Sequence, residues 1–237
     1  MTTEATARAR VVTFDADQTL VDFRTAMQTA LDAALAALQQ RVQAASGLSR
    51  DDLQATRNEV ADELGPAARM EEIRLAAFQR TLEQLGVPDP AFADQLTALY
   101  LDARFGEMRL YDDVLPTLGA LDGYRLGLVS NGNSYPDRAG LARYFEFVLF
   151  AHDHGVRKPE RAFYEAVLAS AGCRADELIH VGDSIANDVV APQALGIRAV
   201  WLNRSGKEKI ASGAWAEIHS LIELPAVLAE AERVRGG

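Results

Sequence analysis

The sequence has very little cysteine and no long apolar run. Cys173 is the only cysteine, which excludes an intramolecular disulfide and a cysteine-ligated metal cluster. No apolar stretch approaches the length needed to cross a membrane, and no apolar segment typical of a signal peptide precedes Val11. We therefore expect a soluble, cytoplasmic protein with no membrane partner.

Positive charge is also scarce. The 237 residues carry 24 lysine and arginine side chains against 34 aspartate and glutamate side chains, a formal net charge of −10. An acidic surface repels phosphate backbones, so we expect no nucleic-acid partner. A small anionic substrate is still compatible with this charge, because a metal ion and a few local donors can reverse its sign inside a pocket.

The predicted helices and strands divide the chain into an all-helical segment and a segment in which strands and helices alternate. A short apolar run at Val11–Phe14 predicts a buried strand, whereas positions 24–105 show only helical periodicity, with four short amphipathic helices. Ser49 and Asp52 resemble a capping box at the start of the second helix. Beyond Tyr111, strands and helices alternate, which predicts a parallel sheet with helices on both faces. The later strands are expected at Arg125–Ser130, Phe147–Ala151, Leu178–Gly182 and Arg198–Leu202, and the helices near Val114–Leu121, Pro136–Tyr144, Arg161–Ala171, Asp188–Leu195 and around Trp215.

The first strand needs the later sheet for its partners, so the helical segment is predicted to be an insertion. We expect an α/β fold with a Rossmann-like parallel sheet core, made of residues 1–22 and 107–237. An inserted four-helix cap is expected over residues 23–106.

Polar residues follow the ends of four predicted strands, where parallel sheets bind their ligands. Several carboxylates converging with one lysine would be costly to desolvate without a cation, and hard oxygen ligands suit Mg²⁺. Serine and turn amides can donate to phosphate oxygens, and a lysine can offset charge while a carboxylate attacks phosphorus. The residues are Asp15, Asp17, Thr19, Ser130, Asn131, Lys158, Asp183 and Asp188.

These residues stand in motifs that resemble a known family. DADQT at positions 15–19, the strand-end Ser130, the Lys158-Pro159 pair and GDSIAND at positions 182–188 are similar, in this order, to the four motifs of the haloacid dehalogenase-like hydrolase superfamily. The helical insert resembles the C1-type cap of its phosphatase branch. The resemblance implies a phosphatase in which Asp15 is the nucleophile that forms an aspartyl-phosphate, and Asp17 is the general acid and then the general base.

The same resemblance implies the ligand contacts. Mg²⁺ would bind the carboxylates of Asp15 and Asp183 and the backbone carbonyl of Asp17, with Asp188 supporting the metal shell. Phosphate would be bound by Thr19, Ser130, Asn131 and Lys158, although a turn-forming role for Asn131 has equal weight. Gln18 stands where many members of the family carry glycine, which should alter packing more than chemistry.

Three features of the sequence narrow the choice of reaction within the family. Members that cleave carbon–halogen bonds lack an aspartate at the position of Asp17, so the presence of Asp17 favours phosphoryl transfer. Phosphonate-cleaving members use a cap lysine, whereas the lysines here are Lys158, Lys207 and Lys209. Sugar-phosphate mutases tend to carry a histidine soon after the first motif, but the first histidine here is His152. A Mg²⁺-dependent phosphomonoesterase is favoured; a phosphotransferase or mutase, and a non-catalytic binding module, are the alternatives.

The expected partner is a small phosphorylated metabolite, such as a nucleotide, a sugar phosphate or a phosphoglycolate-like compound, and the protein is expected to be a monomer or homodimer. Arg24, Arg69 and Arg74 are candidates to bind a second anionic or polar group of this substrate.

Overall fold

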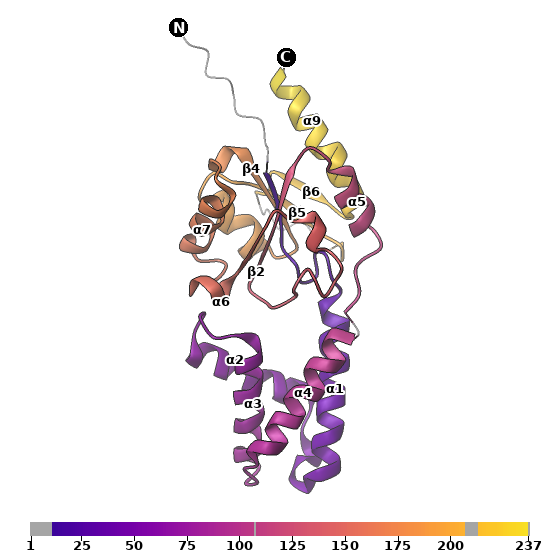
Figure 1. The fold of residues 1–237 in the computed structure, drawn as a ribbon, viewed down its shortest axis with the longest axis vertical. Helices are drawn as coiled ribbons and strands as arrows, with labels where there is room; N and C mark the ends of the chain where they lie inside the picture. The colour runs from indigo at the N-terminus through magenta and orange to yellow at the C-terminus, as the bar shows by residue number, and fades with distance from the viewer. Residues whose placement is uncertain (1–10, 107, 207–212, 237) are drawn as a thin grey trace. The chain divides into compact units, whose positions relative to one another are not determined.

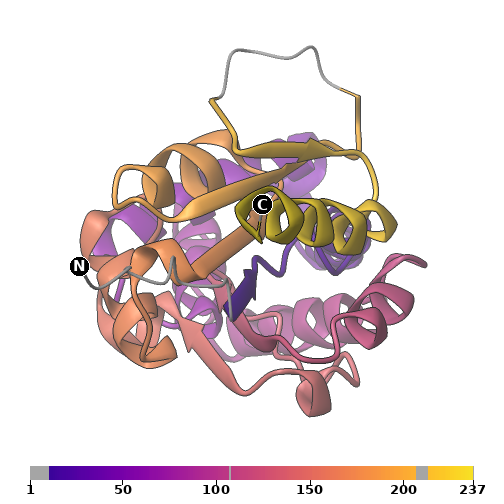
Figure 2. The same cartoon turned by 90° about the horizontal axis from the view of Figure 1, so that it is seen from above.

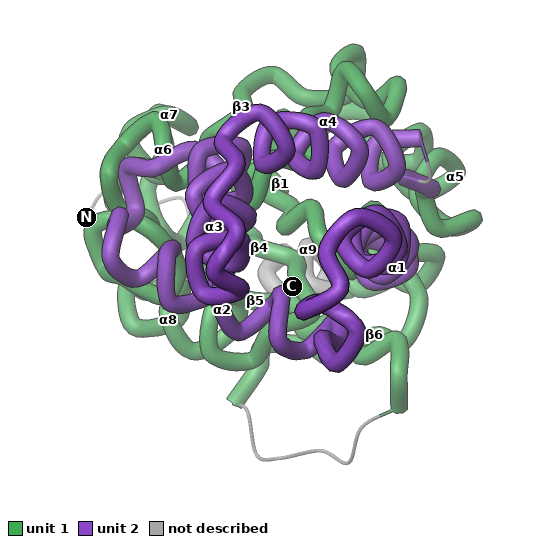
Figure 3. The backbone as a smooth tube through the Cα atoms, turned by 90° about the horizontal axis from the view of Figure 1, so that it is seen from below, with its two compact units in different colours: residues 1–21, 110–237 green, residues 22–109 purple. Residues whose placement is uncertain are grey.

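The protein is seen in a computed structural model that describes residues 11–106, 108–206 and 213–236. The chain divides into two compact units, which Figure 3 colours separately. The core unit comprises residues 1–21 and 110–237, and the cap unit comprises residues 22–109. Within the described residues, no helix combines the length and the apolarity that a membrane crossing requires.

The core unit is built on one six-stranded sheet in the order β3-β2-β1-β4-β5-β6. Every pair of neighbouring strands is parallel, and β6 occupies the edge beyond β5 (Figure 2). The strands are β1 (Val11–Phe14), β2 (Arg125–Ser130), β3 (Phe147–Phe150), β4 (Leu178–Gly182), β5 (Arg198–Leu202) and β6 (Ala216–Ile218).

Helices cover both faces of this sheet. Successive side chains of a strand point to opposite faces, so Val12 and Phe14 of β1 pack on one face and Val11 on the other. Helices α5 (Val114–Ala120) and α9 (Leu224–Gly236) cover the first face, and α7 (Arg161–Ala171) covers the second (Figure 1). The core is therefore the predicted α/β fold.

Two segments differ from the sequence-based expectation. Positions 136–144 form a turn followed by a short 3₁₀ helix, η2 (Ala142–Tyr144), and not the expected helix. Gly140 has a φ of +70°, which interrupts a right-handed helix at this point. The region around Trp215 was expected to be helical but leads into β6, a three-residue edge strand too short to show an alternating pattern.

The segment after β4 also differs in detail. Instead of a helix over Asp188–Leu195, the chain forms a π-helix, η4 (Ile185–Val190), followed by α8 (Ala191–Gln193). The side chain of Ser184 caps the π-helix by accepting a hydrogen bond from the amide of Asn187. Pro192 lacks an amide hydrogen, so a regular α-helical ladder cannot continue through this position. Shorter elements complete the core: α6 (Ala151–His154), η3 (Ala175–Glu177) and η5 (Leu221–Glu223).

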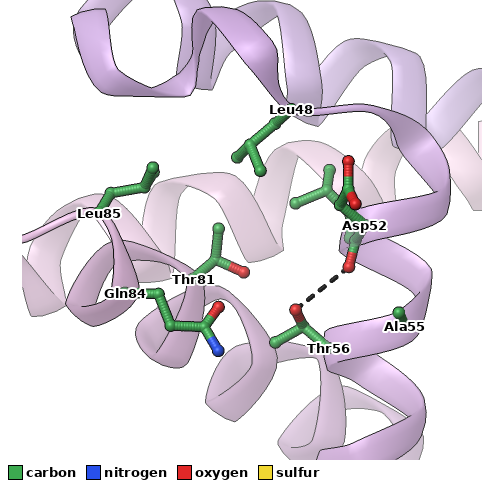
Figure 4. A pocket seen from close by; sticks show the side chains of 8 residues that line it. Leu48, Asp52, Ala55, Thr56, Thr81, Gln84 and Leu85 are labelled. Carbon is green, nitrogen blue, oxygen red and sulfur yellow. Dashed lines mark hydrogen bonds between the residues drawn. The ribbon is translucent and has the colours of Figure 1, made fainter.

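The cap unit contains the four predicted helices, which pack around their own apolar core. Ser49 and Asp52 form the predicted capping box at the start of the second helix. A cavity of about 230 Å³ lies between the second and third helices, where Thr56 donates a hydrogen bond to the carbonyl of Asp52 (Figure 4). The helices are α1 (Phe23–Arg41), α2 (Arg50–Leu64), α3 (Met70–Gln84) and α4 (Pro90–Gly106), with a 3₁₀ turn η1 (Gln43–Gly47) after α1.

Asp113, before α5, ties distant parts of the core unit together. Its carboxylate accepts two hydrogen bonds from Arg204, at 2.8 and 2.9 Å, one from the Ser220 hydroxyl and one from the Leu221 amide. Burial raises the pKa of Asp113, but these hydrogen bonds outweigh burial and hold the pKa below its ordinary value.

We expect Asp113→Asn to lower the free energy of unfolding by about 2 kcal/mol, because a charge-assisted bidentate contact is lost. A depressed carboxyl pKa contributes stability that is present above the unfolded pKa, near 4, and is lost as the pH falls through the folded pKa. Urea unfolding at pH 7 and in acid should therefore show a penalty that shrinks towards low pH. An equal penalty at both pH values would contradict this assignment.

Candidate active site

The end of β1 brings Asp15 next to a buried lysine. The Asp15 amide donates to the carbonyl of Val181 on β4, which continues the sheet ladder one residue beyond β1. The Nζ atom of Lys158 lies 2.6 Å from Oδ1 of Asp15 and 2.8 Å from Oδ1 of Asp188. The sequence separations are 143 and 30 residues, so the fold alone brings these three predicted site residues together.

The three charges strongly perturb one another. Burial raises the pKa of Asp15 well above its usual range, the charges of Asp188 and Asp17 raise it further, and Lys158 only partly opposes them. Burial would also raise the pKa of Asp188, but Lys158 and His180 hold it well below its usual range. The pKa of Lys158 is raised, because the two carboxylates outweigh the effect of burial. The site thus has more negative charge than its lysine can balance.

Asp183 joins this acidic cluster. One carboxylate oxygen from each of Asp15, Asp183 and Asp188 lies within 4.8 Å of the others. Three hard oxygen donors with an excess of negative charge fit a small divalent cation such as Mg²⁺. Asp188 already accepts hydrogen bonds from Lys158, from His180 and from the amide of Ser184, so much of its capacity to bind a cation is already used.

Asp17 contacts the loop that follows β2. The hydroxyl of Ser134 donates a hydrogen bond to Oδ1 of Asp17. A Cβ atom added to Gly132 would lie 2.6 Å from Oδ2 of Asp17, so a side chain at this position would collide with the carboxylate. Ser130 is buried, and its hydroxyl accepts a hydrogen bond from the amide of Gly132. The loop therefore positions the second aspartate of the DADQT motif.

Asn131 makes a reciprocal pair of hydrogen bonds with the backbone of Lys158. Its Oδ1 accepts from the Lys158 amide at 2.8 Å, and its Nδ2 donates to the Lys158 carbonyl at 2.9 Å. These contacts hold the lysine-bearing loop against the end of β2. The sequence suggested either a phosphate contact or a turn-forming role, and the structure shows a third use of this side chain.

Gln18 and Thr19 lie farther along the loop that follows β1. Thr19 is fully buried, its hydroxyl has no hydrogen-bond partner within the described part of the chain, and its carbonyl accepts from Arg204. Gln18 has a φ of +63°, the left-handed conformation that glycine adopts at little cost and other residues at about 1 kcal/mol. Its side chain donates a hydrogen bond to the Tyr111 hydroxyl. The glycine expected here from the family pattern is thus replaced at an energetic cost.

The sequence analysis overlooked His180, which lies beneath the site in the middle of β4. This side chain has no exposed surface, and its ring nitrogens contact the Thr13 hydroxyl at 3.0 Å and Oδ1 of Asp188 at 3.1 Å. Burial lowers the pKa of His180 despite the nearby Asp188 carboxylate. A histidine inside an otherwise apolar strand was the available signal, since buried polar groups need partners.

Gly182, at the end of β4, makes room for Asp188. A Cβ atom at this position would lie 2.6 Å from Oδ2 of Asp188 and 2.5 Å from its Cβ atom. Alanine would therefore push the carboxylate away from Lys158 and His180.

We expect Gly182→Ala to reduce catalytic activity by roughly 10- to 100-fold and stability by about 1–3 kcal/mol. Gly119 of α5 is the matched control, because no atom lies within 4 Å of an added Cβ and alanine favours the helix. Activity and urea unfolding of the two variants would be compared. A Gly182→Ala variant that behaves like Gly119→Ala would show that Asp188 does not need this space.

The candidate substrate-binding arginines lie in the cap unit, in different surroundings. Arg24 and Arg69 are exposed, whereas Arg74 is buried. Lys207 and Lys209 lie outside the described residues, and the described residues of the cap contain no lysine.

The carboxylates and the lysine lie at the C-terminal ends of parallel strands, where open α/β sheets bind their ligands. A family model described as haloacid dehalogenase-like hydrolase matches residues 9–196, and the chain belongs to this family. The helical insertion between β1 and β2 is consistent with its C1 cap.

Relatives in this family carry out different reactions. The chain is 31% identical over 206 residues to the ribulose-1,5-bisphosphate 5-phosphatase of Halopiger xanaduensis, covering 83% of this chain and 86% of that protein. It is 29% identical over 202 residues to the 5-amino-6-(5-phospho-D-ribitylamino)uracil phosphatase YigB of Escherichia coli, covering 82% and 84%. The crystal structure of a 2-haloacid dehalogenase from Pseudomonas syringae pv. tomato DC3000 matches with a TM-score of 0.78 and 33% identity, covering 93% and 98%. Family membership alone therefore does not choose between phosphate and halide chemistry.

Proposed function

We propose that the protein is a Mg²⁺-dependent phosphomonoesterase that works through an aspartyl-phosphate, an acyl phosphate formed on Asp15. The observation that carries this proposal is the second aspartate, Asp17, which Ser134 holds close enough for its charge to raise the pKa of Asp15. A nucleophilic carboxylate next to a second carboxyl group is the pair that acid-base-assisted phosphoryl transfer requires. Dehalogenation needs no proton donor at this position, since halide leaves as an anion.

In the first step, an oxygen of Asp15 attacks phosphorus and the bond to the ester oxygen breaks. Asp17 gives its proton to that oxygen, which leaves as an alcohol. In the second step, Asp17 takes a proton from water, and the water oxygen attacks phosphorus. The bond between phosphorus and Asp15 then breaks, which releases inorganic phosphate and restores the carboxylate.

The other proposed roles follow from charge. Lys158 offsets the negative charge of the phosphate and of the attacking Asp15, and Ser130 and the amides after β2 donate to phosphate oxygens. Asn131 acts chiefly by holding the backbone of Lys158. A contact between the phosphate and Thr19 or Asn131 stays a prediction.

A divalent cation fits the acidic cluster. The carboxylates of Asp15 and Asp183 and the backbone carbonyl of Asp17 would hold Mg²⁺, with Asp188 supporting this set from its contacts with Lys158 and His180. When bound, Mg²⁺ would offset the charge of the phosphate and hold its oxygens in place.

The proposed substrate is a small phosphorylated metabolite, in keeping with the substrates in the names of the two phosphatase relatives. Nucleotides, sugar phosphates and phosphoglycolate-like compounds are the classes to compare. The phosphotransferase or mutase and the non-catalytic binding module are the competing functions.

Phosphate and chloride release measured side by side test this function. Purified protein would be given a generic aryl phosphate, the metabolite panel and 2-chloropropionate, each with Mg²⁺ and with a chelator. The proposal expects Mg²⁺-dependent phosphate release, abolished in Asp17→Asn for alkyl phosphates, and no chloride release. Chloride release without phosphate release would replace the proposal with a dehalogenase, and transfer of phosphate to an acceptor would replace it with a mutase.

A further inference from the structure

The cap unit contains a buried guanidinium that pairs with no carboxylate among the described residues. Arg74 of α3 is 5% exposed, and its Nη2 donates a hydrogen bond of 3.2 Å to the hydroxyl of Tyr100 on α4. The guanidinium carbon lies 4.2 Å from the centre of the Tyr100 ring and 6.0 Å from that of Phe78. Within the described residues, no carboxylate forms a hydrogen bond or an ion pair with Arg74.

Two neighbouring arginines add positive charge around Arg74. Burial lowers the pKa of Arg74, and the charges of Arg57 on α2 and Arg104 on α4 lower it further, although Tyr100 opposes them. Arg104 is itself buried, with its guanidinium carbon 4.9 Å from the ring centres of Phe23 and Phe105. Because Tyr100 and Arg104 are four residues apart on one helix, they lie on the same face of α4.

Other arginines of this protein show the usual arrangement. Arg204 in the core unit also lies over a tyrosine ring, at 4.0 Å from Tyr111, but its guanidinium is paired with Asp113 through two hydrogen bonds. Arg80, farther along α3, is paired with Glu63 through two hydrogen bonds of 2.7 and 2.6 Å. Arg74 is more deeply buried than either and has a tyrosine hydroxyl in place of the carboxylate.

A buried cation without an anion is unfavourable. Contact with the Tyr100 ring offsets only part of the hydration free energy that the guanidinium loses on burial, and the neighbouring arginines repel its charge. An anion from solution would remove this cost, and the planar guanidinium donates two parallel hydrogen bonds to a carboxylate or a phosphate.

We propose that Arg74, Tyr100 and Arg104 form an anion-binding site within the cap unit, which takes a carboxylate or phosphate group of a small metabolite. Arg74 supplies the paired donors, the Tyr100 hydroxyl a third, and Arg104 further positive charge. The anion is a group of a free metabolite from solution, so this site does not rest on the proposed function.

Binding of malonate, which has two carboxylates and no phosphate, tests the site without turnover. Calorimetric titration of the full-length protein in Mg²⁺-free buffer should show binding that weakens at least about tenfold in Arg74→Met. Arg80→Met is the charge-matched control, since it removes a half-buried arginine of the same helix that is paired with Glu63, and it should bind malonate like the wild type. Arg74→Lys keeps the charge without the planar fork and should bind with intermediate affinity. If Arg74→Met does not fold, Arg74→Lys alone tests the site.

Two results would overturn the site. One is the absence of malonate binding to the wild type, and the other is equal binding by the wild type, Arg74→Met and Arg74→Lys. These results do not depend on phosphatase activity, so the site and the proposed function can fail separately.

Discussion

Replacing Asp15 with asparagine is expected to reduce phosphate release by roughly 10⁴-fold or more, because the reaction loses its nucleophile. The amide has almost the same shape as the carboxylate but cannot form the aspartyl-phosphate. Asp15 is 7% exposed, and its position is fixed by the amide contact with Val181 and by Lys158. These contacts can persist in the variant, since the amide oxygen still accepts a hydrogen bond from Lys158.

Stability is expected to stay the same or to rise in Asp15→Asn. The raised pKa of Asp15 shows that its charge is unfavourable in the folded protein, so a neutral side chain removes a cost. Phosphate release and thermal unfolding would be measured together. Asp153→Asn, an exposed carboxylate on α6, is the control and should keep its activity. An Asp15→Asn variant with more than about a tenth of wild-type activity would contradict the role of Asp15 as nucleophile.

Replacing Lys158 with methionine is expected to damage both activity and stability. The lysine ammonium is the cation that lies between the buried carboxylates of Asp15 and Asp188, at 2.6 and 2.8 Å. Removing one partner of a buried ion pair leaves the other charge uncompensated, at a cost of about 3–5 kcal/mol. Phosphate release should also become at least about 100-fold slower, since the charge that offsets the phosphate is lost.

Urea unfolding in Mg²⁺-free buffer measures the stability loss of Lys158→Met. Added Mg²⁺ should restore part of it, because a cation that binds only the folded state stabilises that state. Arg161→Met is the control, since its ion pair with Glu165 is exposed and should contribute less than about 1 kcal/mol. A Lys158→Met protein as stable as Arg161→Met would show that the lysine does not offset the charge of these carboxylates.

Much of the fold could be predicted because its signals are local. The strands β1, β2, β4 and β5 are short apolar runs that end in polar residues, and the cap helices carry apolar residues every three or four positions. The turn at Gly140 and the edge strand β6 could not be predicted in this way. The spacing of apolar residues does not show that Gly140 has a positive φ. A three-residue strand is too short to show the alternation of apolar and polar residues that marks a strand.

The site could be predicted only in part, for a different physical reason. Motif residues at strand ends must converge in any parallel sheet, which is why Asp15, Lys158 and Asp188 meet as expected. Contacts between loops depend on how each loop folds. The hydrogen bonds from Ser134 to Asp17 and from Asn131 to the Lys158 backbone span 117 and 27 residues, and no local pattern encodes them.

The most direct test of the central claim is to capture the phosphate on Asp15. Asp17→Asn would be mixed with Mg²⁺ and an aryl phosphate, whose good leaving group needs no proton, and the reaction would be quenched in acid. Without Asp17 as base, the second step is slow, so the covalent aspartyl-phosphate should accumulate. The account predicts one phosphoryl group on the peptide that contains Asp15, and none when Asp15 is also changed to asparagine. Phosphate release with no labelled peptide, or a label on another residue, would contradict the proposed mechanism.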